Sequence, residues 1–167
     1  MPFLKTIQYR GGIARFQIPA SWVEEYEPQG GGTFYEPVDD TGTLRINVLG
    51  FDRKADSRTP APTAFDLLAC TRSGDEVEVL PSGAAIARYV THAEERGENL
   101  RIHNWQIGIC VPPTHFRIVV FTYAIVEGQE RDPKMMEKLK LLDRLIATGE
   151  YPAVEGVAGD YYHEPVA

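Results

Sequence analysis

Two histidines and an acid lie on either side of a predicted tight turn. His92 and Glu94 precede Arg96-Gly97-Glu98, and His103 follows it, in two predicted antiparallel strands. If the last two residues of that tripeptide form the turn, His92 faces His103, and two imidazoles with a carboxylate supply zinc-type ligands. If the first two form it, the pairing shifts by two positions and the site disappears. A polar pair near an exposed hairpin tip is the ordinary state of such histidines, so we predict no metal site.

A cysteine and a histidine flank a second predicted bend. Cys110 is followed by Val111-Pro112-Pro113-Thr114 and then by His115. A nucleophilic cysteine needs a nearby histidine and surroundings that favour the thiolate. A buried, inert thiol is the commoner state within an apolar strand, and Cys70, in a helical pattern, is interpreted in the same way. We therefore predict no catalytic residue and no disulfide.

Three consecutive glycines, Gly30-Gly31-Gly32, resemble a phosphate-binding loop only superficially. Such a loop needs a helix directly after the glycines and a cation nearby. Here a predicted strand follows, and the flanking residues include Glu27 and Glu36. The sequence predicts a flexible connection between strands and no bound cofactor.

Acidic and aromatic residues around these glycines are the candidates for contact with another protein. The acids form either a solvated face or a rim that contacts a basic partner. Trp22 follows a serine that is typical of a helix cap, so it is interpreted as a core anchor beneath a short helix. The predicted partner-binding residues are Tyr26, Tyr35, Glu24, Glu25, Glu36, Asp39 and Asp40.

An antiparallel sheet must position these side chains. The last two predicted strands carry apolar residues on both faces, so layers must cover both faces of the sheet. Capping signals at Thr63-Ala64-Phe65-Asp66 and Asp132-Pro133 predict two helices, and Ser21-Trp22-Val23-Glu24 predicts a short third helix. The expected fold is α+β, an antiparallel sheet of about six strands sandwiched by helices. One strand is predicted to start at Phe34 and Tyr35, and the others are predicted at residues 13–18, 44–51, 84–95, 100–111 and 116–126, with an additional short strand left open at 77–80.

Composition limits the class of protein. The chain has 167 residues, 43% of them hydrophobic, and a formal net charge of −7, which fits one globular domain. The negative charge disfavours binding to nucleic acid and to anionic lipid. No apolar run reaches the roughly 18 residues of a membrane span, and residues 1–10 lack a signal-peptide core, so we expect a cytoplasmic protein. The domain is predicted to cover residues 1–149, followed by an acidic, tyrosine-containing tail at 150–167.

The element order, with Phe16-x-Ile18-Pro19-x-x-Trp22 followed by the strand that contains Phe34, resembles the Mog/PsbP/DcrB-like fold group. The resemblance covers residues 13–147 and implies an α/β/α sandwich. Members of this group mostly bind other proteins, and some bacterial relatives resemble chaperones of secreted effectors. The chain departs from the DcrB-type members because it lacks a lipoprotein signal, and no site of the group maps onto it residue by residue.

The sequence therefore predicts a non-catalytic protein-binding domain, of the kind that serves as a chaperone, an adaptor or an immunity protein of a secretion system. Its expected partner is another protein, and a homodimer stays open. One alternative is a small-ligand or metal-binding domain on the face that carries His92 and His103. The other is an enzyme that uses Cys110 and His115.

Overall fold

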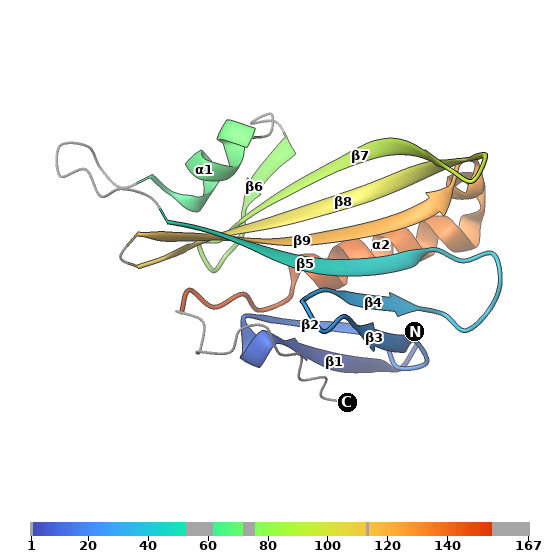
Figure 1. The fold of residues 1–167 in the computed structure, drawn as a ribbon, viewed down its shortest axis with the longest axis horizontal. Helices are drawn as coiled ribbons and strands as arrows, with labels where there is room; N and C mark the ends of the chain where they lie inside the picture. Colours follow the sequence, from blue (N-terminus) through green and yellow to red (C-terminus); the bar gives the residue numbers. More distant parts are fainter. Residues whose placement is uncertain (1, 53–61, 72–75, 113, 155–167) are drawn as a thin grey trace.

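The computed structural model describes residues 2–52, 62–71, 76–112 and 114–154. Figure 1 shows a long curved sheet with the longer helix along one face and the shorter helix near one end. The elements are, in order, β1 (Leu4–Tyr9), the 3-10 helix η1 (Arg10–Gly12), β2 (Ala14–Pro19), β3 (Val23–Tyr26), β4 (Gly32–Tyr35), β5 (Thr43–Asp52), α1 (Ala64–Thr71), β6 (Val77–Val79), β7 (Ala85–Glu95), β8 (Glu98–Val111), β9 (His115–Val126), the 3-10 helix η3 (Gln129–Arg131) and α2 (Pro133–Ala147).

Seven strands form the main sheet, in the order β3-β4-β5-β9-β8-β7-β6. Every neighbouring pair is antiparallel. Alternation along β9 explains its central position, because Val119 and Phe121 are buried on one face while Phe116 and Ile118 are buried on the other. The predicted α+β class and the antiparallel sheet are confirmed, and the short strand at 77–80 is β6.

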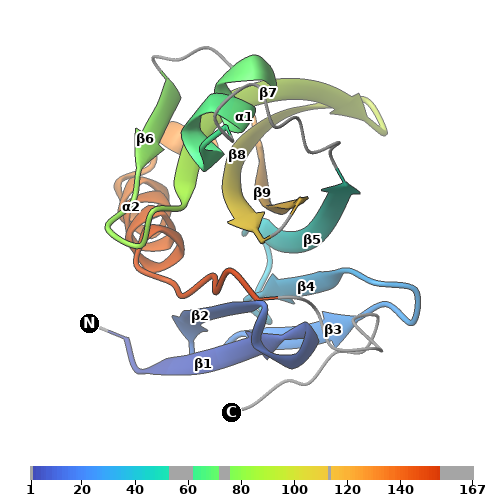
Figure 2. The ribbon, with the colours of Figure 1, turned by 90° about the vertical axis from the view of Figure 1, so that its left-hand side faces the viewer.

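Different layers cover the two faces of the sheet. On one face α2 and the β1–β2 hairpin enclose the larger core, where Phe16 makes edge-to-face contacts with Phe34 and Phe121. On the other face α1 packs its fully buried Leu68 near Phe116. Figure 2 shows the β1–β2 hairpin below α2 and β4, with α1 at the opposite end of the view. The expectation that both faces must be covered is therefore correct.

The first predicted strand does not belong to the main sheet. β2 pairs with β1 in a separate two-stranded sheet, with Tyr9 opposite Ala14 and Leu4 opposite Pro19. No sequence pattern predicts an element for residues 4–9. Ile7 and Tyr9 in β1 are nevertheless fully buried, because the hairpin packs as a unit onto the main core.

The predicted helix after Ser21 is wrong, because residues 23–26 form β3, an edge strand that pairs with β4. Tertiary contacts outweigh the local capping pattern here. The Lys5 ammonium donates to the Trp22 carbonyl and forms an ion pair with Glu24 at 2.7 Å, which holds this segment extended. Trp22 is a core anchor as predicted, although it stacks on Tyr123 and the short helix expected above it does not form.

Both longer helices begin where their capping signals predict. Thr63 and Asp66 exchange reciprocal side-chain to backbone hydrogen bonds of 3.1 and 3.0 Å at the start of α1. The Asp132 carboxylate accepts from the Lys134 amide at 3.0 Å, with proline at the first position of α2. No helix among the described residues is long and apolar enough to cross a membrane. Cys70 on α1 is exposed, so its expected burial is wrong.

The segment after α2 returns to the core. Glu150 forms a bridge with Arg15 of β2, and the buried Tyr151 donates to the Ile146 carbonyl at 2.6 Å. The buried Arg117 guanidinium donates to the carbonyl oxygens of residues 152 and 154. The start of the predicted tail therefore packs as part of the domain, whereas residues 155–167 lie outside the described part of the chain.

Candidate functional site

β7 continues well beyond its neighbour on the outer side. β6 pairs only with Ala85–Ala87, and among the described residues no other strand pairs with β7 on that side. The residues of β7 beyond β6 lie at the upper border of the sheet in Figure 1. Most edge strands are short or covered, because unpaired backbone groups attract other chains. A long edge of this kind is therefore a feature that needs an explanation.

The direction of the backbone groups along β7 follows from two observations. The Ala84 carbonyl accepts from the Leu80 amide at 2.8 Å, so the backbone N–H and C=O groups of the even-numbered residues of β7 point toward the β6 side. At the other end, Glu95 and Glu98 flank a two-residue turn formed by Arg96 and Gly97, and the flanking residues of such a turn bond to each other through their backbones. The backbone groups of the odd-numbered residues of β7 therefore point toward β8. The pairing with β8 has no interruption between these points. The β7 edge is therefore defined as the outward N–H and C=O groups of Arg88, Val90, His92 and Glu94.

A groove of about 530 Å³ lies beside this edge, between α2 and the inner face of β7 and β8. We call it the β7 groove. Val90, which is 38% exposed, is on its rim, and Trp105 and Leu139 supply apolar wall. Its charged and polar lining includes Arg88, His103, Lys140 and Asp143. An extended chain on the β7 edge would point every second side chain toward this groove, because side chains alternate along a strand.

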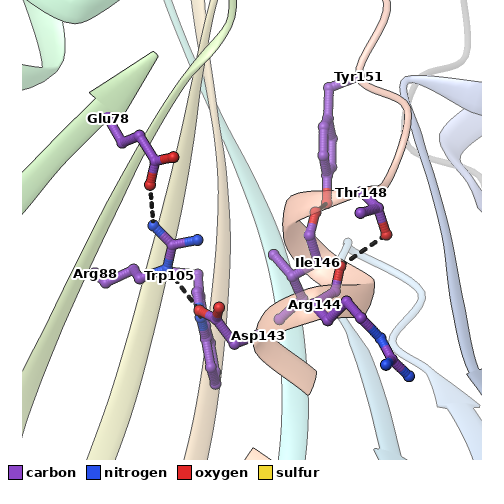
Figure 3. A network of polar contacts seen from close by, with 8 residues as sticks. All are labelled: Glu78, Arg88, Trp105, Asp143, Arg144, Ile146, Thr148 and Tyr151. Carbon is purple, nitrogen blue, oxygen red and sulfur yellow. Dashed lines mark hydrogen bonds and ion pairs between the residues drawn. The ribbon is translucent and has the colours of Figure 1, made fainter. Parts of the chain in front are cut away.

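An ion-pair network fixes the wall of the groove (Figure 3). The Arg88 guanidinium donates through Nε to Asp143 Oδ1 at 2.6 Å and through Nη1 to Glu78 Oε2 at 2.9 Å. The Trp105 indole N–H donates to the same Asp143 oxygen at 2.9 Å. One carboxylate thus ties α2 to β7 and β8. The network positions Arg88 at the inner end of the edge.

His103 stacks on Trp105, with ring centroids 6.4 Å apart. Burial lowers the pKa of the His103 imidazole, and the nearby Arg101 guanidinium lowers it further. Its Nε2 atom is buried and has no hydrogen-bond partner among the described residues. His103 therefore lines the groove as a neutral ring at neutral pH.

Of the two turns that the sequence leaves open, the one that would place His92 opposite His103 does not form. Because Arg96 and Gly97 are the turn residues, with φ of 51° and 80°, His92 lies opposite Arg101 and His103 lies opposite Val90. Positive φ at both central residues is typical of the type I′ turn that two-residue hairpins favour. In the described part of the chain, no group of three or more His, Cys, Asp or Glu side chains could hold a metal.

Cys110 and His115 also fail to meet. Cys110 lies opposite Phe116, and His115 lies opposite Val111, so the two side chains point to opposite faces of the sheet. The half-buried Cys110 thiol donates to the Pro62 carbonyl at 3.7 Å, whereas His115 Nδ1 lies 3.1 Å from Asp52 Oδ1. This geometry supports no cysteine–histidine dyad.

The three glycines form the connection between β3 and β4. Gly30 and Gly31 both have φ of 110°, which only glycine adopts readily. The Gly31 amide donates to the Tyr9 hydroxyl at 2.8 Å, and the Gly30 amide donates to the Glu27 carbonyl at 3.1 Å. These bonds make a defined turn anchored on β1 in place of the flexible loop that the sequence predicts.

The predicted partner-binding residues separate into three groups. Glu24 faces the β1–β2 hairpin, where it binds Lys5 and accepts from the Tyr26 hydroxyl at 2.7 Å. Burial, followed by the bond to Glu24, raises the pKa of Tyr26. Glu25 and Tyr35 bond to each other at 2.7 Å on the opposite face of β3 and β4. The third group is dispersed beyond β4: Glu36 pairs with Lys138 of α2 at 2.6 Å, and the exposed Asp39 and Asp40 lie between β4 and β5.

The β7 edge is the feature that sequence reasoning missed. The signal was present, because the predicted short strand at 77–80 is much shorter than the strand predicted at 84–95. A length mismatch between neighbouring strands of a hairpin leaves the longer strand with an unpaired edge. The direction of its backbone groups depends on the turn residues, which the sequence left open.

Comparisons with known proteins support the fold. No protein-family model matches the chain, and no curated protein matches it in sequence. A protein from Bacteroides thetaiotaomicron aligns with a TM-score of 0.58 and 18% identity over 89% of this chain. The chain spans about half of that protein's length, 48%. LpqN of Mycobacterium tuberculosis, described as involved in cell envelope biogenesis, aligns with a TM-score of 0.51 and 15% identity over 82% of each chain. PA94 of Pseudomonas aeruginosa, a protein of unknown function and putative regulator by its description, aligns with a TM-score of 0.41 and 14% identity over 83% of this chain and 93% of its own.

Proposed function

We propose that this domain is a non-catalytic protein-binding module that accepts an extended segment of a partner protein on the β7 edge. The observation that carries the proposal is the outward set of backbone donors and acceptors at Arg88, Val90, His92 and Glu94, which no described strand satisfies. Strand addition supplies affinity through main-chain hydrogen bonds, and pockets for alternate side chains supply specificity. The β7 groove beside the edge provides such a pocket.

The protein-binding role agrees with the fold group that the sequence resembles. We propose membership of the Mog/PsbP/DcrB-like group on the element order and on the likeness in shape to LpqN. A chaperone, adaptor or immunity protein acts through an accessible recognition surface and needs no catalytic residues. The β7 edge supplies an accessible surface of this kind. A cytoplasmic location stays a prediction, which fractionation of the source cells tests.

The test compares bait proteins that differ at one outward backbone group. His92→Pro removes an outward N–H and leaves the pairing with β8 intact, because proline is tolerated on edge strands. Glu25→Ala, on the exposed face of β3, is the matched control at the opposite border of the sheet. Each full-length bait is immobilised in equal amount, and the proteins retained from a lysate of the source organism are quantified by mass spectrometry.

We expect the wild-type chain and Glu25→Ala to retain the same partner, and His92→Pro to lose it. Circular dichroism and urea unfolding of each bait show whether the variants remain folded. Hydrogen exchange of the recovered complex should protect the amides of Val90, His92 and Glu94. Retention of the same partner by a folded His92→Pro bait refutes the proposal, whereas loss on Glu25→Ala alone assigns binding to β3.

A further inference from the structure

We propose that the bound segment runs antiparallel to β7 and presents three side chains to the protein: a basic one toward Glu94, an apolar one toward Val90 and an acidic one toward Arg88. This inference rests on the proposed function and specifies the chemistry of the partner at the same edge. Residues opposite each other on antiparallel strands place their side chains on the same face. The acidic and the apolar side chain of the segment would therefore be two residues apart, and the apolar and the basic side chain four residues apart. All three would lie on the α2 side of the sheet.

The acidic contact follows from the surroundings of Arg88. Its guanidinium carries five N–H donors, and the two bonds to Asp143 and Glu78 engage Nε and Nη1. Its Nη2 group donates no hydrogen bond to the described residues, and its side chain is still 34% exposed. Lys140 lines the same groove and adds positive charge. The two cations are balanced by the carboxylates of Asp143 and Glu78, so a carboxylate opposite Arg88 binds through the remaining Nη2 donors of a guanidinium that the protein already holds in place.

The apolar and basic contacts follow from the residues farther along the strand. Val90 lies on the rim of the groove, with Trp105 and Leu139 behind it, so an aliphatic side chain opposite Val90 buries its surface there. Glu94 is exposed and lies next to Glu95 at the end of β7. A lysine or arginine opposite Glu94 removes like-charge repulsion that an acidic segment would suffer.

Both ends of the site are closed by the fold. β6 occupies the positions opposite Ala85–Ala87, and the Arg96–Gly97 turn ends the strand on the other side. The segment is therefore limited to the stretch between Arg88 and Glu95. Every strand pair in the sheet is antiparallel, and antiparallel pairing is slightly more stable per residue, so we assign that orientation to the added strand.

The experiment uses the full chain, labelled with 15N, and a synthetic peptide Thr-Lys-Thr-Val-Thr-Val-Thr-Asp with blocked ends. Aligned antiparallel, its lysine faces Glu94, its second valine faces Val90 and its aspartate faces Arg88. Titration is followed by amide chemical shifts, which report each residue of β7 separately. We expect larger shifts for Val90, His92 and Glu94 than for Thr91 and Ala93, whose amides already bond to β8.

A charge-swap cycle tests the chemistry. Replacing the lysine of the peptide by glutamate should weaken binding to the wild-type chain by about two- to five-fold, and Glu94→Lys should restore it. A nitroxide at the amino end of the peptide tests orientation. In the antiparallel arrangement it broadens the amide signals near Glu94 more than those near Arg88.

Each remaining outcome overturns a defined statement. Equal affinities throughout the cycle overturn the proposed charge pattern but not the addition of a strand. Broadening by the nitroxide that is strongest near Arg88 overturns the antiparallel orientation. If neither peptide shifts the amides of the β7 edge at about millimolar concentration, the inference is wrong, and the His92→Pro comparison decides the proposed function separately. If these amides shift with protein concentration alone while the molecular mass doubles, a second copy of the chain occupies the edge and the inference is also wrong.

Discussion

Removing the carboxylate of Asp143 should destabilise the domain mainly through the Trp105 indole. Asp143→Ala deletes the acceptor of two hydrogen bonds, from Arg88 Nε at 2.6 Å and from Trp105 Nε1 at 2.9 Å. Trp105 is 4% exposed, and a buried donor without an acceptor costs about 1–3 kcal/mol. Water in the adjoining groove can reach the indole, so the lower part of that range applies, about 1–2 kcal/mol.

The ion pair contributes less than the indole bond. The side chains of Arg88 and Asp143 are 34% and 40% exposed, and solvent-screened pairs of this kind contribute about 0.5–1 kcal/mol. The expected loss in free energy of unfolding for Asp143→Ala is therefore about 1.5–3 kcal/mol. Equilibrium unfolding in urea, followed by far-ultraviolet circular dichroism, measures it on the full chain.

Two further variants separate the contributions. Asp143→Asn keeps an oxygen that accepts from the indole and loses only the charge, so we expect a loss of about 0.5–1 kcal/mol. Arg88→Met removes the ion pair and leaves the bond between Trp105 and Asp143. Equal losses for Asp143→Asn and Asp143→Ala would refute the assignment of the larger part to the indole. A loss below about 0.5 kcal/mol for Asp143→Ala would refute the whole estimate.

Three other predictions concern helix capping, acid stability and packing. Thr63→Ala should lower the free energy of unfolding by about 0.5–2 kcal/mol, because it removes the cap of α1, and unchanged urea unfolding contradicts this. The lowered pKa of His103 means that the unfolded chain binds its proton more readily, so stability should fall as the pH drops through about 6.5 and below. His103→Phe should flatten that acid limb of a stability–pH profile, and parallel profiles contradict the assignment. Gly42→Ala should cost about 1–3 kcal/mol by overpacking, because a Cβ there would overlap the Tyr123 ring, and a thermal melt at neutral pH measures it.

The three long strands and two of the helices were predictable because their signals are local. In β9, Phe116 and Ile118 alternate with Val119 and Phe121 within a few residues, and this pattern indicates that both faces of the strand are buried. The capping box at Thr63 and the Asp132-Pro133 start of α2 involve neighbours three residues apart or fewer. Local signals of this kind hold in the folded protein unless a tertiary contact opposes them.

Ser21-Trp22-Val23-Glu24 shows what happens when a tertiary contact opposes the local pattern. The capping-box pattern favours a helix, but Lys5 from β1 binds both the Trp22 carbonyl and the Glu24 carboxylate. Pairing with β4 then completes the extended segment as β3. The same fold divides the predicted partner-binding residues, because alternation sends Glu24 and Glu25 to opposite faces.

The sequence by itself determined the α+β class, the covered sheet and the positions of the main helices, because hydrophobic periodicity and caps act over a few residues. Only the tertiary structure decided the register of the β7–β8 hairpin, since two turns were compatible with the sequence and Arg96–Gly97 formed. That register separated His92 from His103 and turned the backbone groups of Arg88, Val90, His92 and Glu94 outward. The candidate site exists because β6 begins only at Val77, which pairs with Ala87, so its pairing reaches no farther along β7, a matter of which strands meet in space.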